Sequence, residues 1–134
     1  MTRIALPIWE GRVSPVFDVA EHLLFVDFDG TRERWRRLHR VHGPDPASRV
    51  QALAAYDVNL LICGAISRTV EHAVTGAGIE VEAGICGDVE RVLCAFALGN
   101  LSAEAALHLP GSAQGGGEAG RLGGRRTARS VGTQ

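Results

Sequence analysis

The sequence has 134 residues, of which 46% are hydrophobic, and a formal net charge of −1 at pH 7, values that fit a single globular domain. A net charge this close to zero gives no reason to expect nucleic acid as a partner. The amino terminus does not have the pattern of a signal peptide, and no apolar run is long enough to span a membrane, so we expect a cytoplasmic protein with no membrane contact. Three cysteines are too few for a disulfide framework, so we expect reduced thiols.

Apolar runs predict five β-strands in chain order. They cover residues 4–8, 23–28, 33–41, 58–62 and 79–85. Asp29-Gly30, between the second and third runs, is typical of a hairpin turn. Between the first and second runs we expect a loop, because Pro15 disfavours helical geometry at Ser14.

Helical spacing of apolar residues predicts three helices, over 47–56, after Ser67 and after Asp88. Cys94 lies within the last helix, and we expect it in the core. The resulting order, β-β-β-α-β-α-β-α, predicts an α/β fold with a mixed sheet and helices on both faces, because each βαβ unit places its strands in parallel.

The end of the chain has a different composition. Residues 110–134 are rich in Gly, Ser, Ala and Arg and contain almost no large apolar side chain, so they cannot offset the entropy of ordering. We therefore expect a folded domain over 1–109 and a disordered Gly/Arg-rich tail over 110–134.

The tripeptide Ile-Cys-Gly occurs twice, at 62–64 and at 85–87. If the two preceding strands are neighbours, Cys63 and Cys86 lie at the carboxyl edge of the sheet, where ligands bind in open α/β folds. Paired thiolates there can bind a soft metal or an iron–sulfur species, and Gly64 and Gly87 would let it approach the backbone. The alternative is two small buried hydrophobic residues.

Several segments, taken together and in order, resemble one known family. They are 1–7, Ser14-Pro15 with Phe17, 62–67, 78–81 and 87–89. Over residues 1 to about 105 the chain is similar to the dinitrogenase iron–molybdenum cofactor biosynthesis family, of the NifX, NifY and NifB carboxyl-terminal domain type. Many relatives have a His directly before the loop Phe, whereas this chain has Val16, so which ligand replaces it stays open.

The resemblance implies a three-layer ribonuclease H-like fold with a mixed five-stranded sheet in the order 3-2-1-4-5, strand 2 being antiparallel. It also implies a small non-catalytic carrier of the iron–molybdenum cofactor, or of an iron–sulfur precursor, during nitrogenase-type cofactor assembly. The partners it implies are this metallocofactor cargo and cofactor-assembly proteins. A homodimer is also left open.

In the implied sheet order the first strand is central, so the loop over 9–18 reaches over the same edge as Cys63 and Cys86. Arg12 could then bind carboxylates of the cargo bidentately, and Ser14 could hydrogen-bond it. Free N–H groups at the helix start after Ser67 would add anion donors. The alternatives are an ordinary surface loop, with Phe17 in the core, and an ordinary helix cap.

Two other functions stay open. Cys63 could be a low-pKa nucleophile of a thiol enzyme, because it precedes a helix start. The chain could also be a protein-interaction adaptor that uses the Arg-rich segment 32–40 as its contact. We interpret that segment as a charged edge strand rather than as a nucleic-acid surface.

Overall fold

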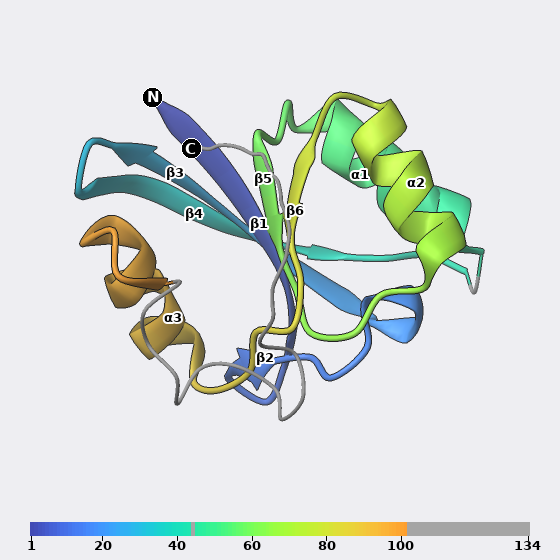
Figure 1. Ribbon diagram of the computed structural model, residues 1–134, viewed down its shortest axis with the longest axis horizontal. Coiled ribbons are helices and arrows are strands. Elements are labelled where there is room, and N and C mark those ends of the chain that lie inside the picture. The colour runs from blue at the N-terminus through green and yellow to red at the C-terminus, as the bar shows by residue number, and fades with distance from the viewer. Residues whose placement is uncertain (44, 102–134) are drawn as a thin grey trace.

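The computed structural model describes residues 1–43 and 45–101, and these form a mixed sheet between helices (Figure 1). The strands are β1 (Thr2–Trp9), β2 (Arg12–Val13), β3 (His22–Asp29), β4 (Arg32–Arg40), β5 (Leu60–Ile62) and β6 (Glu80–Glu82). Their order is β4-β3-β1-β5-β6, with the two-residue β2 paired to the end of β1. The predicted order and the antiparallel second strand, β3, are confirmed. The predicted tail over 110–134, and residues 102–109 of the predicted domain, lie outside the described residues.

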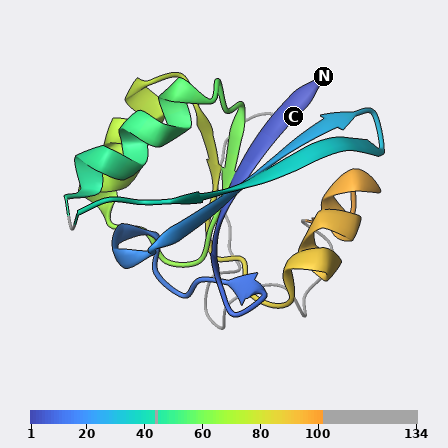
Figure 2. The ribbon, with the colours of Figure 1, turned by 180° about the vertical axis from the view of Figure 1, so that it is seen from behind.

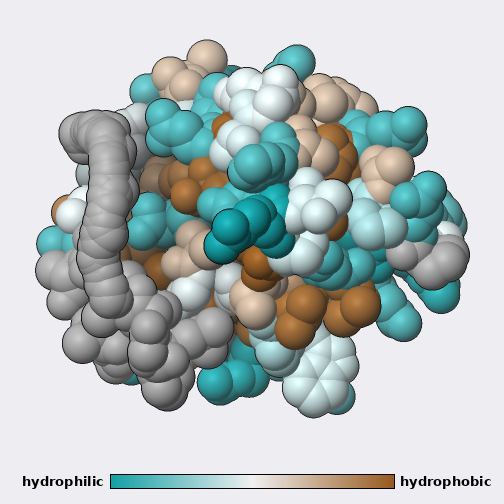
Figure 3. All heavy atoms as spheres, turned by 45° about the vertical axis from the view of Figure 1, so that its right-hand side comes forward, coloured by the Kyte–Doolittle hydropathy of each residue, from teal (hydrophilic) through white to brown (hydrophobic). Residues whose placement is uncertain are grey.

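Helices cover both faces of the sheet, which makes three layers (Figures 1 and 2). They are α1 (Pro46–Ala55), α2 (Arg68–Gly76) and α3 (Val89–Ala97), with a short 3₁₀ helix, η1, at Phe17–Val19. Both predicted caps are present, since Ser67 Oγ accepts a hydrogen bond from Val70 N at 3.3 Å and Asp88 Oδ2 accepts one from Arg91 N at 3.2 Å. Hydrophilic residues cover much of the face on which α1 and α2 lie (Figure 3). None of the described helices is both long and apolar enough to cross a membrane.

The central strands alternate between two cores, as the two-residue period of a strand requires. Ile4 and Leu6 of β1 pack with α3 in one core, whereas Ala5 of β1 packs with α1 and α2 in the other. Because both faces of β1 are buried, its side chains are unavailable to a ligand until the strand ends.

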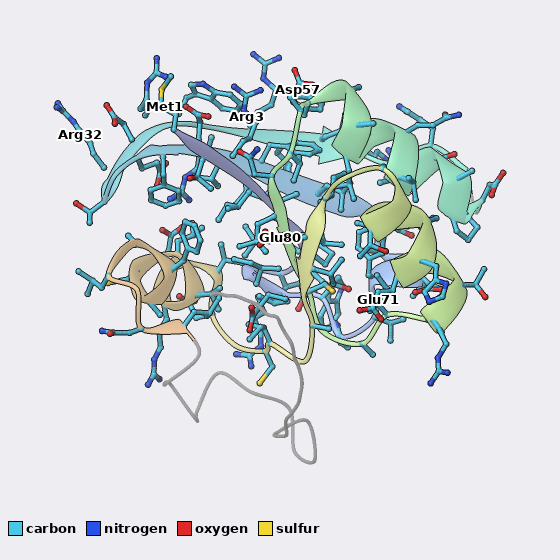
Figure 4. The ribbon with its side chains drawn as sticks, turned by 45° about the horizontal axis from the view of Figure 1, so that its top comes forward. Met1, Arg3, Arg32, Asp57, Glu71 and Glu80 are labelled. Carbon is cyan, nitrogen blue, oxygen red and sulfur yellow. The ribbon has the colours of Figure 1, made fainter. Side chains whose placement is uncertain are left out.

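A charged cluster lies at the amino end of β1, around Arg3 (Figure 4). Arg3 Nε is 3.2 Å from Asp27 Oδ1, and the guanidinium lies over the Trp35 ring at 4.9 Å from its centroid. Arg34 also pairs with Asp27, at 3.3 Å. This cluster compensates the buried Asp27 carboxylate and joins β1, β3 and β4, at the end of the sheet opposite the carboxyl edge of β1.

Two local predictions are wrong. The last strand ends at Glu82 rather than at residue 85, and Gly84, with a positive φ of 79°, interrupts the extended backbone before Ile85. Cys94 is exposed rather than in the core. It follows Leu93, which faces the sheet, by about 100° around the helix, and this rotation turns its side chain to solvent.

Candidate functional site

The segment between β1 and β3 lies across the carboxyl edge of the sheet, as expected. Its first half pairs with the segment before α3, where Val13 N donates to Gly87 O and Val89 N to Gly11 O, each at 2.9 Å. Its second half pairs with the segment after β5, where Ala65 N donates to Pro15 O at 2.8 Å. The chain therefore covers both Cys-Gly segments with its own loop.

Gly64 is required by this covering loop. A Cβ atom at Gly64 would lie 2.6 Å from Pro15 O and 2.9 Å from Ser14 O, both backbone atoms. We expected the absent side chain to make room for a ligand, but the group that approaches Gly64 is the protein's own backbone. The carbonyl of Gly87 accepts a hydrogen bond from the same loop.

The two cysteines lie on neighbouring segments but in different environments. The strands β5 and β6 are adjacent and parallel, as predicted, and beyond them Cys63 N donates to Glu82 O at 3.0 Å while Ile85 N donates to Cys63 O at 2.9 Å. Cys63 is 0% exposed, in the core beneath α1 and α2, whereas Cys86 is half-buried. The repeated tripeptide thus occupies two positions that are not equivalent.

Burial also determines the chemistry of Cys63. Desolvation, followed by the negative charges of Glu71, Asp18 and Glu82, raises the pKa of its thiol to about 12. A thiol that is neutral at physiological pH is a poor nucleophile, which is the opposite of what an enzyme using Cys63 needs. In the described part of the chain, no three His, Cys, Asp or Glu side chains are grouped so as to hold a metal ion. The assignment of Cys63 and Cys86 as metal ligands stays a prediction.

The start of α2 is already occupied by an acidic side chain. Ser67 N donates to Asp18 Oδ1 at 3.0 Å, and Ser67 Oγ caps Val70 N. A carboxylate at a helix start uses the donors and the dipole that would otherwise attract an external anion. The structure therefore favours a capping role for Ser67, with Asp18 holding η1 against α2.

Arg12 lies at the tip of the β1–β2 turn and is exposed. Its backbone forms an isolated bridge with Asp88, which brings it beside the start of α3. Arg12 is not among the lining residues of the cavity described next, which Ser14 lines. Its predicted role in binding the carboxylates of a cargo stays a prediction.

A cavity of about 720 Å³ opens where β1 ends, and we name it the β1-end pocket. Its lining combines exposed apolar side chains with a few polar ones. The residues are Ile8, Trp9, Glu10, Ser14, Pro15, Val19, Ala20, Glu21, His22 and Leu38. Trp9, Val19 and Leu38 are 59%, 69% and 57% exposed, so a contiguous apolar surface faces solvent here.

Ser14 is the predicted site residue that lines this pocket. It is only 6% exposed, and its N–H donates to Pro7 O at 2.7 Å. Within residues 1–43 and 45–101, no protein group forms a hydrogen bond with Ser14 Oγ. A buried hydroxyl without a partner is costly, so it is available to a ligand or a water molecule in the pocket.

His22 and Trp9 also line this pocket, although neither is among the predicted binding residues. Ile8 pairs with His22 in the register of β1 and β3, which places the imidazole beside the end of β1. An imidazole is a common ligand of transition metals, and an indole gives a broad apolar contact. The available signal was their position, since Trp9 is the first residue of the loop over 9–18 and His22 begins the strand that follows it.

Comparison with known proteins agrees with this architecture. Residues 1–99 match the profile of the family described as dinitrogenase iron-molybdenum cofactor. Among curated proteins, none matches the sequence.

Three solved structures give the structural comparison. PH0822 has a TM-score of 0.73 and 20% sequence identity, covering 83% of this chain and 96% of that chain. A NifB-like protein from Thermotoga has a TM-score of 0.59 and 27% identity, covering 75% and 90%. The apo orange protein of Desulfovibrio gigas has a TM-score of 0.61 and 24% identity, also covering 75% and 90%. The likeness to PH0822 and to the orange protein shows a shared fold.

Proposed function

The chain belongs to the dinitrogenase iron-molybdenum cofactor family, and from this premise we propose that it binds a metal–sulfur cluster in the β1-end pocket and carries it without chemical change. The cluster would be the iron–molybdenum cofactor or an iron–sulfur precursor, in nitrogenase-type cofactor assembly. The observation that carries the proposal is the composition of this pocket, in which the Ser14 hydroxyl, without a hydrogen-bond partner among the described residues, and the His22 imidazole lie among exposed apolar side chains.

The donor set fits a cluster that arrives with its own ligands. Within the described residues no three metal-ligand side chains converge, and we therefore propose that the cluster arrives preassembled. A preassembled cluster keeps its sulfides and needs an apolar surface, one or two protein ligands and a few hydrogen bonds. Trp9 and Leu38 can give the surface, His22 a ligand, and Ser14 a hydrogen bond to a sulfide or a carboxylate.

The non-catalytic role and the setting are part of the same proposal. A buried Cys63 with a raised pKa supports packing at this position rather than nucleophilic catalysis. Reduced thiols and oxygen-sensitive clusters both suit the cytoplasm. The exposed pocket rim is where a cofactor-assembly protein, or a second copy of the chain, would contact the cargo.

The test is an anaerobic titration of the full chain with the isolated iron–molybdenum cofactor and with an iron–sulfur precursor, followed by absorbance and EPR. His22→Gln and Ser14→Ala test the pocket, Cys63→Ala/Cys86→Ala tests the thiols, and Cys94→Ala is the matched control for an exposed thiol. We expect His22→Gln to weaken binding and to alter the EPR signal, and Ser14→Ala to weaken binding without altering the signal.

The competing outcomes are distinct. If only the double cysteine variant loses the cluster, the thiols hold the cargo and the assignment to the β1-end pocket is wrong. If the wild-type chain takes up neither species, the proposed carrier function is wrong.

A further inference from the structure

A second cavity, of about 390 Å³, adjoins the β1-end pocket. Val19 and Glu21 line both cavities. The remaining lining residues come from the end of β4, the connection that follows it and the first turn of α1. They are Arg40, Val41, Gly43 and Arg49.

Arg49 is the unusual residue of this cavity because it is buried and has no acidic partner among the described residues. It is 3% exposed, and its guanidinium donates to backbone carbonyls, from Nε to Ala20 O at 3.0 Å and from Nη1 to Asp45 O at 3.3 Å. Within the described residues no carboxylate lies within 4.0 Å of it. A guanidinium has five N–H donors, so most of them remain for a group inside the cavity.

Arg40 adds a second positive charge to the same cavity, from the exposed end of β4. Glu21 adds one negative charge, but it forms no ion pair with either arginine in the part of the chain that the structure describes. The two guanidinium groups therefore leave this lining with an excess of one positive charge. Arginine recognises tetrahedral and planar oxyanions through parallel N–H donors, and a buried cation favours an anionic counter-ion.

We propose that this cavity binds a phosphate group, held between Arg40 and Arg49 with a P–OH group directed to the Glu21 carboxylate. Phosphate fits the mixed lining because hydrogen phosphate carries both acceptor oxygens for the arginines and a proton to donate to a carboxylate. Sulfate has the same shape and charge but no proton at neutral pH, so Glu21 repels it. This site shares Val19 and Glu21 with the β1-end pocket, but phosphate binding here does not depend on the binding of a cluster there.

The test is calorimetric titration of the full chain with inorganic phosphate and with sulfate, alongside ¹⁵N NMR of the Arg49 Nε–H and the Ala20 and Glu21 amides. We expect saturable phosphate binding that shifts these signals, and sulfate binding at least about tenfold weaker. Arg40→Gln, at an exposed position, should weaken phosphate binding about tenfold or more, whereas Arg37→Gln, an exposed β4 arginine outside the cavity, should leave it unchanged.

Three results would overturn the proposal. They are an absence of saturable phosphate binding by the wild-type chain, equal losses in Arg40→Gln and Arg37→Gln, and equal affinity for sulfate and phosphate. The last would remove the role given to Glu21. Arg49→Gln is a supplementary variant, read only if its NMR spectrum stays folded, and it should abolish the phosphate-induced shifts.

Discussion

Replacing Gly64 with alanine should destabilise the folded chain strongly, because the new methyl group would meet backbone atoms on the covering loop. Its Cβ would lie 2.6 Å from Pro15 O and 2.9 Å from Ser14 O, so the loop must move away. Overpacking of this kind costs about 1–3 kcal/mol. The displaced loop also strains the bonds from Ala65 N to Pro15 O and from Phe17 N to Ala65 O, both 2.8 Å, each worth about 1 kcal/mol at most.

The expected loss in free energy of unfolding is therefore about 1–5 kcal/mol, and each kcal/mol lowers the Tm by about 4–8 °C for a domain of this size. Urea unfolding followed by circular dichroism measures it. Gly76→Ala is the matched control, because no atom lies within 4 Å of its Cβ position and it ends α2, where alanine should be neutral or stabilise by up to about 1 kcal/mol. If Gly64→Ala unfolds at the same urea concentration as the wild type, the covering loop does not pack as described.

Further predictions concern pH and charge. Burial raises the pKa of the Cys63 thiol from 9.0 to about 12, so as the pH rises the thiol ionises first in the unfolded chain. The contribution of the neutral thiol to the free energy of unfolding is therefore complete below pH 9 and is lost as pH rises toward 12. Between pH 9 and pH 10.5 the wild type should lose about 2 kcal/mol more of its free energy of unfolding than Cys63→Ala does. If the free energy of unfolding falls with alkaline pH at the same rate in wild type and variant, the thiol is not buried as described. The Arg36 guanidinium lies 2.7 Å from a carboxylate oxygen of Glu33 and 2.7 Å from one of Glu90 in α3, and it lowers the pKa of both carboxyl groups. The stability that these two ion pairs contribute is therefore present above pH 4.5 and is lost in acid. Arg36→Gln should cost about 0.5–1 kcal/mol at low salt and less at 1 M salt, measured by urea unfolding, and a cost that salt leaves unchanged would show that the pairs do not act through charge.

Connectivity and capping were the predictable parts of the fold. Because the connections between parallel strands are short, the order of elements allows few arrangements of the strands in the sheet. Ser67 and Asp88 indicate two helix starts, because their side-chain oxygens can accept hydrogen bonds from free N–H groups there. The end of the last strand was not predictable, because Ile85 continues the apolar run beyond Gly84, whose positive φ interrupts the extended backbone.

The site was less predictable because it depends on register and on what covers each segment. Cys63 and Cys86 share a tripeptide, but Cys63 directly follows a strand and lies in the core, whereas Cys86 follows the turn at Gly84 and is half-buried. His22 reaches the β1-end pocket only because it pairs with Ile8, and a register of this kind is set by the packed sheet. Ser14 was identified from its place in the loop, although its burial could not be anticipated.

The central claim is that the cluster lies in the β1-end pocket, and NMR of the cluster-loaded chain tests it directly. A paramagnetic cluster broadens the signals of nearby nuclei most strongly. The account predicts that the Trp9 indole N–H and the Ser14 and His22 amides broaden first, while the exposed Cys94 amide on α3 stays sharp. Broadening centred on Cys63 and Cys86, with a sharp Trp9 indole signal, would contradict the account and place the cargo at the thiols.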